Sequence, residues 1–248
     1  MLTLENVTKR YGDLTAVNDL SLSLPAGQIL GFLGPNGAGK TTTMKMICGL
    51  VRPSSGRVLV NGVDVAVDPL TTKANVGYVP DRPHVYERLT ALEHMYFVGG
   101  LYSVPPAQIE SRSVTLLELF GLGDRLHQLV ESFSHGMKQR LVMASVLLHE
   151  PRLLVVDEPM VGLDPMGARL LKDVLREHAA KGMSVLLSTH TLEVADEVCD
   201  DIAVIHHGVL IAQGSPASLR ARTGAEGERL ETVFLQLTSE AESAAAGL

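Results

Sequence analysis

The sequence predicts an α/β protein whose core is a parallel sheet, with an antiparallel β part at its N-terminus and a helical insertion. Three observations predict this arrangement. Short apolar runs, typical of strands buried on both faces, recur along the chain. A glycine-rich loop and a helical pattern follow the first of these runs directly. Alternating patterns precede that run, and a long stretch of helical periodicity separates it from the next one.

The first elements are expected to be strands. Leucine and valine alternate with polar residues at Leu2, Leu4 and Val7, and leucine alternates with serine over Leu20–Leu24. An apolar run at 28–33 then suits a buried parallel strand. It ends in the glycine loop at 34–39, and a helix is expected from about Lys40 to Leu50. Strand, loop and helix form one βα unit.

Helical periodicity dominates from about Leu89 to Glu150. One helix is expected over Ser111–Phe120, with an apolar face made of Val114, Leu117 and Leu119. A second helix is expected to begin after Ser134, which is a suitable N-cap, and to stop before Pro151.

The C-terminal part returns to alternating strands and helices. The expected elements are a strand at Leu153–Val156, a helix around Arg169–Lys181, a strand at Ser184–Ser188, and a hairpin of Ile202–Ile205 with Val209–Gln213. His206 and His207 fall at the hairpin turn, where we expect them to be solvated. The tail after Ser215 is rich in Ala, Glu and Gly, and a single ordered piece is expected at Leu230–Leu237.

Composition narrows the function classes. The chain has 248 residues and a net charge of −7. Proteins that bind nucleic acids neutralise the phosphate backbone with positive charges, so no nucleic-acid partner is expected. Its two cysteines form neither a disulfide framework nor a metal-binding spacing. No apolar stretch approaches the length that spans a bilayer, and no signal peptide is recognised. We therefore expect a cytoplasmic protein whose membrane role, if any, comes through a partner.

One motif carries the chemistry of a phosphate site. Gly34-Pro35-Asn36-Gly37-Ala38-Gly39-Lys40-Thr41 matches G-x-x-x-x-G-K-[ST] in full. Glycines let backbone N–H groups converge on one anion, and the following helix adds its positive N-terminus. Lys40 is expected to reach the β- and γ-phosphates of ATP, and the Thr41 hydroxyl to hold Mg²⁺, with Thr42 beside it. The alternative is a glycine turn followed by a surface lysine, which the strand-loop-helix context disfavours.

Carboxylates close the next apolar strand. Asp157 stands at the carboxyl end of that strand, where α/β sheets bind ligands, and suits the Mg²⁺-holding role. The adjacent Glu158 is expected to orient and deprotonate the attacking water. His190, which ends the following strand, can donate to the γ-phosphate. The alternatives without a catalytic role are a solvated acidic turn for Asp157 and Glu158, and a structural histidine for His190.

Together these motifs resemble the nucleotide-binding subunit of ABC transporters. The resemblance covers about Leu2 to Pro216. It implies that Tyr11 stacks on adenine, that Val17 supports the ring, and that His190 is the switch histidine. It also places the family's signature, usually L-S-G-G-Q, at Phe133-Ser134-His135-Gly136-Met137, and matches Gly162-Leu163-Asp164-Pro165 to the loop after the metal carboxylate.

Two positions depart from the family pattern. In the signature, Ser134 and Gly136 are retained, whereas His135 and Met137 replace the usual residues. Asp81 stands where the family usually has a glutamine that contacts Mg²⁺, and a shorter, charged side chain can serve the metal through a water. The resemblance thus implies a metal set of Thr41, Asp81 and Asp157, with Glu158 and His190 as catalytic residues.

The resemblance also implies an architecture and a function. A P-loop NTPase core of about residues 1–88 and 152–216, a helical subdomain at 89–151, and a C-terminal extension at 217–248 are expected. Two copies, expected to form a homodimer, would sandwich ATP, and a separate transmembrane permease subunit would hold the chain at the inner face of the cell membrane. The ending at Glu231–Thr238 resembles exporter-type subunits. The alternatives are a non-transport ABC ATPase acting on nucleic acid or ribosomes, and a P-loop kinase for a small metabolite.

Overall fold

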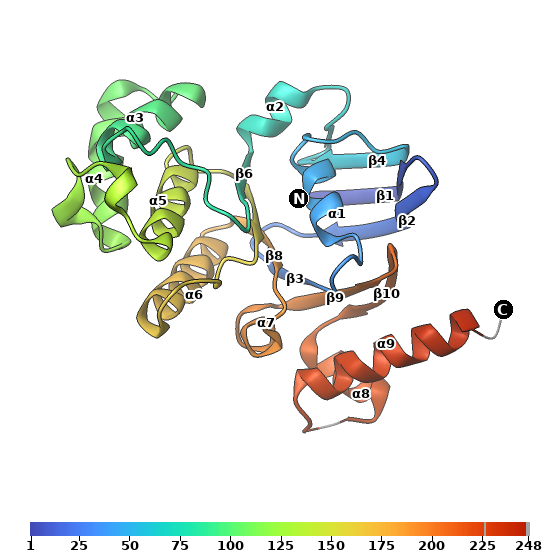
Figure 1. Ribbon diagram of the computed structural model, residues 1–248. Coiled ribbons are helices and arrows are strands. Elements are labelled where there is room, and N and C mark those ends of the chain that lie inside the picture. Colours follow the sequence, from blue (N-terminus) through green and yellow to red (C-terminus); the bar gives the residue numbers. More distant parts are fainter. Residues whose placement is uncertain (226, 247–248) are drawn as a thin grey trace.

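The computed structural model describes residues 1–225 and 227–246, which form two β-sheets flanked by helices (Figure 1). The larger sheet has six strands in the order β10-β9-β3-β8-β7-β6. Its strands are β3 (Ile29–Leu33), β6 (Val76–Val79), β7 (Leu153–Asp157), β8 (Ser184–Ser188), β9 (Asp201–His206) and β10 (Val209–Gly214). Strands β6, β7, β8, β3 and β9 run parallel, and only β10 of this described sheet is antiparallel to its neighbour. The predicted α/β fold class is confirmed.

The smaller sheet is antiparallel, which confirms the expected antiparallel β part at the N-terminus. Its order is β2-β1-β4-β5, made of β1 (Leu2–Tyr11), β2 (Leu14–Leu24), β4 (Ser55–Val60) and β5 (Val63–Asp64). Strand β2 begins earlier than the leucine-serine alternation indicates, because the ladder continues beyond it: Val17 pairs with Lys9, and Leu14 with Tyr11. This longer ladder carries Tyr11 and Val17 to one edge of the molecule.

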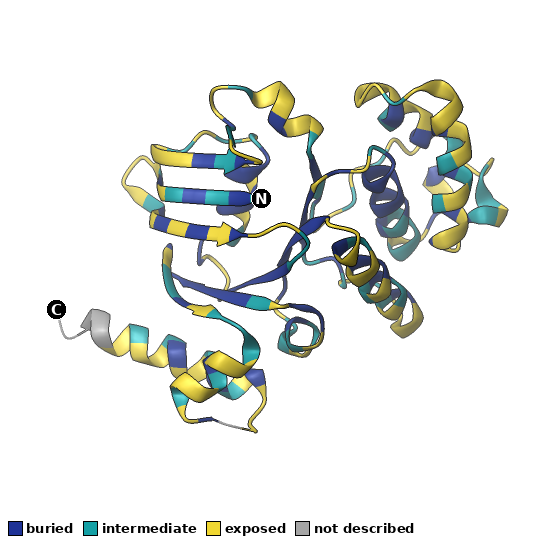
Figure 2. Cartoon of the chain, turned by 180° about the vertical axis from the view of Figure 1, so that it is seen from behind, coloured by how far each residue is buried: buried dark blue, intermediate teal, exposed yellow. Residues whose placement is uncertain are grey.

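The main sheet is apolar on both faces, and alternate residues of each strand enter different cores. In β7, Leu154 and Val156 join the cluster that contains the helices α3 to α9, whereas Leu153 and Val155 join the cluster of α1 and the antiparallel sheet. Figure 2 shows the parallel strands of the sheet mostly in the colour of buried residues, whereas the edge strand β10 is partly exposed. Burial on both faces explains why these strands appear in the sequence as unbroken apolar runs.

The helices before β7 are α1 (Lys40–Ile47), α2 (Pro69–Ala74), α3 (Ala91–Leu101), α4 (Pro106–Leu119) and α5 (His135–Leu147), with 3₁₀ turns η1 (Gly123–Arg125) and η2 (Val130–Ser132). The predicted start and face of α4 are wrong. The helix begins at Pro106, since proline is accepted at the first helical position. Ile109, Leu117 and Phe120 are buried, whereas Leu119 is 39% exposed because it lies on the opposite side of the turn.

Helix α6 (Pro165–Ala180) also begins earlier than predicted. Asp164 caps it by accepting a hydrogen bond from the Gly167 backbone N–H at 2.7 Å, and Pro165 takes the first helical position. The cap is important for function because it fixes the end of the loop that begins after Glu158.

The tail is more ordered than the sequence indicates. Beyond α7 (Leu192–Val198), it forms α8 (Pro216–Thr223) and α9 (Leu230–Ala246), instead of one short piece. Leu230, Val233 and Leu237 of α9 are buried in the core. The expectation of two solvated histidines is wrong for His206, which is only 7% exposed, because it still belongs to β9 and lies under α9, 3.6 Å from Glu242. Among the described residues, no helix is long and apolar enough to cross a membrane.

Candidate active site

The glycine-rich loop connects β3 to α1 at the carboxyl end of the central strand. Gly37 and Gly39 have φ angles of 81° and 106°, a region in which a side chain is strained. Gly39 is also the N-cap of α1, and no side chain caps this helix. The first turn of α1 therefore offers backbone N–H groups toward the loop, which is the arrangement that binds phosphate.

Two neighbouring segments hold the loop from behind. The Gly208 backbone N–H donates to the Ala38 carbonyl at 2.9 Å, and the Gly208 carbonyl accepts from Asn18 N–H at 2.8 Å. A Cβ at Gly34 would lie 2.3 Å from the Ile205 carbonyl oxygen, so only glycine fits there. The sequence does not predict the contact between Gly208 and the phosphate loop. The only sequence feature that points to it is the glycine of the predicted His207-Gly208 turn.

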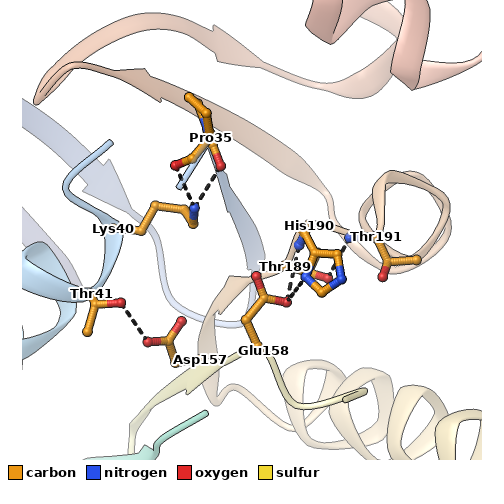
Figure 3. Close-up of polar contacts among 9 residues, drawn as sticks. Pro35, Lys40, Thr41, Asp157, Glu158, Thr189, His190 and Thr191 are labelled. Atoms are coloured by element: carbon orange, nitrogen blue, oxygen red, sulfur yellow. Dashed lines mark hydrogen bonds and ion pairs between the residues drawn. The ribbon is translucent and has the colours of Figure 1, made fainter. Parts of the chain in front are cut away.

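Lys40 lies over the loop that precedes it. Its Nζ donates to the carbonyl oxygens of Gly34 at 2.7 Å and Pro35 at 3.1 Å (Figure 3). Burial lowers the pKa of Lys40, while the charges of Glu158 and Asp157 act in the opposite direction. The ammonium therefore lies within the electrostatic reach of both carboxylates, at the centre of the predicted site.

Thr41 and Asp157 meet as the metal hypothesis requires. Thr41 Oγ1 donates to Asp157 Oδ2 at 3.0 Å, across 116 positions of sequence (Figure 3). Asp157 is 3% exposed, so its carboxylate is largely withdrawn from water. A hydroxyl and a carboxylate are hard oxygen donors of the kind that Mg²⁺ selects, and this pair, a buried carboxylate beside an exposed hydroxyl, fits such an ion.

Glu158 and His190 form the second pair. The His190 Nδ1 lies 2.8 Å from Glu158 Oε2, and the His190 backbone N–H donates to the same oxygen at 3.2 Å. Glu158 has a φ of 50°, rare for a residue with a side chain, and its backbone N–H is fixed by the Ser188 carbonyl at 3.0 Å. Figure 3 shows Glu158 between Lys40 and His190.

Tyr11 and Val17 lie on the antiparallel sheet, and Val17 lies beside the loop. Val17 is buried, and its Cγ2 would lie 3.3 Å from a Cβ at Gly39. Tyr11 is 46% exposed, and Lys9 Nζ lies 4.9 Å from its ring centroid. Tyr11 thus presents a partly exposed aromatic ring on the strand beside that of Val17, and its stacking on a base stays a prediction.

Asp81 follows β6, the strand next to β7. Its Oδ1 accepts a hydrogen bond from the backbone N–H of Arg82 at 2.9 Å, and its side chain is exposed. Within the described residues, no hydrogen bond joins Asp81 to Thr41 or Asp157, and no group of three acidic, histidine or cysteine side chains forms a metal cluster. The metal role of Asp81 stays a prediction.

Ser134 and Gly136 lie apart from the phosphate loop of the same chain. Ser134 caps α5 by accepting from the Met137 backbone N–H at 3.3 Å, and it is exposed. Helix α5 packs with α3 and α4 in one apolar cluster, whereas α1 belongs to the other, across the sheet (Figure 1). The structure therefore does not bring the signature residues to the loop within one chain.

A family model described as ABC transporter matches residues 17–161, which include the phosphate loop, Asp157 and Glu158. The chain belongs to the ABC transporter family. Its relatives include the linearmycin resistance ATP-binding protein LnrL of Bacillus subtilis, 38% identical over 91% of this chain and 73% of that protein. The daunorubicin/doxorubicin resistance ATP-binding protein DrrA of Streptomyces peucetius is 39% identical over 95% of this chain and 72% of that protein.

Solved structures agree with the sequence relatives. An ATP-binding subunit of an ABC transporter has a TM-score of 0.91 at 35% identity, and the match covers 96% of this chain and 99% of that one. The chain is thus an ATP-binding subunit of the ABC family and an ATPase. The nucleic-acid ATPase and the small-molecule kinase are not favoured by these comparisons.

Proposed function

We propose that two copies of this chain sandwich two ATP molecules and power export through a separate membrane subunit. The observation that carries the proposal is the meeting of three groups at the carboxyl ends of adjacent strands. These are the phosphate loop after β3, the Thr41–Asp157 pair at β7, and the Glu158–His190 pair between β7 and β8. This edge of an α/β sheet is where ligands bind.

Each group has one task in the proposed reaction. The loop from Gly34 to Thr42 and the Lys40 ammonium bind the phosphates, and Tyr11 with Val17 holds the adenine. Thr41 and Asp157 would hold Mg²⁺, which would supply positive charge beside the phosphates, and Asp81 would serve the ion through water. Glu158 accepts the proton of the attacking water, and His190 fixes the Glu158 carboxylate in its orientation.

A second copy supplies the remaining phosphate ligands. Ser134 and Gly136 stand exposed or half-buried at the N-terminus of α5, which favours anions, yet they lie across the sheet from this chain's own loop. A partner's ATP placed against α5 would use both. In a two-fold dimer, each copy contributes one phosphate loop and one signature segment. Each ATP molecule then lies in the interface between the two copies.

The membrane partner has a candidate surface on the helical region, 89–151, and the residues just before it. We propose this region as a subdomain distinct from the core, and 217–248 as a C-terminal extension that packs on the core through α8 and α9. Tyr86 and Phe97 pack edge to face with ring centroids 4.7 Å apart, yet are 58% and 39% exposed. Leu101, on the same helix as Phe97, is 67% exposed. Exposed aromatic and aliphatic residues that gather in this way mark interaction surfaces. The chain would thus lie at the inner face of the membrane.

The experiment is a recovery assay. A tagged chain is purified from detergent-solubilised membranes of the source cell, next to a Phe97→Asp variant and an exposed control, Glu118→Gln. We expect the wild type and the control to co-purify a multi-span membrane protein, and Phe97→Asp to lose it while retaining its ATPase activity. Export is then tested by measuring resistance and efflux with drug panels, since several relatives are named for drug resistance. A wild-type chain that recovers no membrane protein would contradict the transporter proposal.

A further inference from the structure

A histidine in the signature segment packs on the loop that follows Glu158. A Cβ built on Gly162 would lie 2.5 Å from His135 Nδ1 and 3.1 Å from its Cε1, so the imidazole occupies the space that a side chain at 162 would need. Gly162 also has a φ of 78°. A side chain at 162 would therefore be strained by the backbone angle and would also displace the ring of His135.

A second close approach reinforces this contact. A Cβ at Gly136 would lie 2.9 Å from the Gly162 carbonyl oxygen. Two consecutive residues at the start of α5 thus face one glycine of the loop. Both distances show that the start of α5 packs closely against the Gly162 backbone.

The loop itself joins functional residues. It begins at Glu158, whose carbonyl accepts from the Val161 backbone N–H at 3.2 Å, and Leu163 N–H donates to the Met160 carbonyl at 3.2 Å. It ends at Asp164, the cap of α6. His135 lies between Ser134 and Gly136. The contact therefore connects the segment that starts at the proposed general base with the segment proposed to bind the partner's ATP.

We propose that His135 is a positioning residue for ATP hydrolysis. Its ring fixes the loop at residues 160–164 against the N-terminus of α5, so that Glu158 and Ser134 keep one relative placement when two copies close on ATP. The inference rests on the proposed ATP sandwich. The ring acts by shape, which explains how a residue far larger than the usual glycine is accommodated at this signature position.

The test compares His135→Ala with His135→Phe, which retains a flat ring, and with His127→Ala, an exposed histidine of the segment after η1. In the nucleotide-free chain, we expect His135→Ala to speed hydrogen exchange at the Val161 and Leu163 amides by about 10-fold. The ATPase kcat should fall by about 10-fold, because a misplaced Glu158 slows the chemical step. The KM should not change, because ATP binding is not affected. His135→Phe should retain both wild-type values, and so should His127→Ala.

A double-mutant cycle isolates the contact. Gly162→Ala should lower kcat in the wild-type background, and the additional loss should shrink by about 5-fold or more when His135 is already alanine. The strain of the positive φ at 162 is common to both backgrounds and cancels. Additive effects within 2-fold, or unchanged amide exchange in His135→Ala, would overturn the inference. Faster exchange with an unchanged kcat would also overturn it.

Separate experiments can contradict the proposed ATP sandwich and the proposed role of His135. Amide exchange is measured on the single chain without ATP and does not depend on the sandwich. A wild-type chain that hydrolyses ATP only as a monomer would contradict the sandwich, while altered exchange in His135→Ala would still show that the ring holds the loop.

Discussion

Glu158 Oε2 accepts two interactions from one residue: the His190 ring nitrogen lies at 2.8 Å and the His190 backbone N–H at 3.2 Å. The Glu158 side chain is 19% exposed and that of His190 is 66% exposed. The histidine therefore fixes the carboxylate from the solvent side. Among the described residues, the other Glu158 oxygen has no hydrogen-bond partner, so it is placed to accept a proton from water.

Replacing Glu158 with glutamine should stop hydrolysis while preserving binding. The amide has the same shape but cannot take a proton, so we expect kcat to fall by roughly 10²–10⁴-fold. Mg-ATP should still bind, because Lys40, Thr41 and Asp157 remain. Steady-state phosphate release and a nucleotide-binding titration measure the two effects, and Glu118→Gln on α4 serves as the exposed control. Full activity in Glu158→Gln would show that another residue is the base, with His190 as the next candidate.

Removing the Lys40 side chain should abolish tight ATP binding. Its ammonium already donates to loop carbonyls at 2.7 and 3.1 Å, so it is placed above the loop where phosphates would bind. Each charge-assisted hydrogen bond contributes about 1.5–3 kcal/mol, so Lys40→Ala should raise the Kd by roughly 100-fold or more. Lys45→Ala, an exposed lysine in the last turn of the same helix, is the matched control. An unchanged Kd for Lys40→Ala would remove the phosphate-loop assignment.

Loss of the Tyr11 ring should weaken nucleotide binding without base selectivity. Stacking on an aromatic ring is worth about 1–3 kcal/mol per base, and every base has a π-face. Tyr11→Ala should therefore weaken ATP and GTP binding alike, by about 5- to 150-fold, whereas Tyr11→Phe should bind as the wild type does. Equilibrium titration of both nucleotides measures this. If Tyr11 were only a strand residue, Tyr11→Ala would lower the free energy of unfolding and leave the Kd unchanged.

The sequence predicts those parts of the fold that are determined by residues close together along the chain. Apolar runs such as Leu153–Val156 became buried parallel strands, and the glycine loop adopted the positive φ angles that its glycines allow. What it mispredicts depends on contacts between distant segments. Leu119 is apolar yet exposed, because the packing of α4 sets which side faces the core. Likewise α9 extends to Ala246, since burying Leu230, Val233 and Leu237 stabilises a helix that its composition alone leaves marginal.

The same distinction applies to the site. The residues of the phosphate loop are consecutive in the sequence, so the motif alone predicts which of them lie together. The Thr41–Asp157 and Glu158–His190 contacts join residues 116 and 32 positions apart. The sequence predicts that Thr41 and Asp157 share a metal ion, and it predicts roles for Glu158 and His190 without predicting that they pair. The packing of His135 on Gly162 had no sequence signal, because it depends on the position of α5 relative to a loop in another part of the chain.

Acidification should destabilise the helical region through His94. This side chain is 3% exposed, its Nδ1 has no hydrogen-bond partner, and burial lowers its pKa from 6.5 to about 4. The unfolded chain therefore binds the proton more readily, and the free energy of unfolding falls as the pH drops from 6.5 toward 4. The loss should be about 3 kcal/mol, most of it reached near pH 4.

Urea unfolding at pH 7, 6, 5 and 4 measures this loss. Other groups also titrate in this range, so the informative quantity is the difference between variants. His94→Leu should show a shallower decline than the wild type, whereas His127→Gln, at an exposed histidine, should follow the wild-type curve. Parallel curves for all three proteins would show that His94 is protonated equally in the folded and unfolded states.

The ATP sandwich predicts a dimer that depends on Ser134. In Glu158→Gln, ATP persists because it is bound but not hydrolysed, so the ATP-bound dimer should accumulate. Sedimentation velocity with Mg-ATP should show a monomer shifting to a dimer, and addition of EDTA should reverse the shift. Ser134→Arg in the Glu158→Gln background should abolish the dimer, because the longer side chain crowds the γ-phosphate of the partner's ATP. Ser111→Arg, on the exposed surface of α4, adds the same charge and bulk elsewhere and should leave the dimer intact. If both arginine variants dimerise equally, Ser134 lies outside the interface and the signature does not bind the partner's ATP.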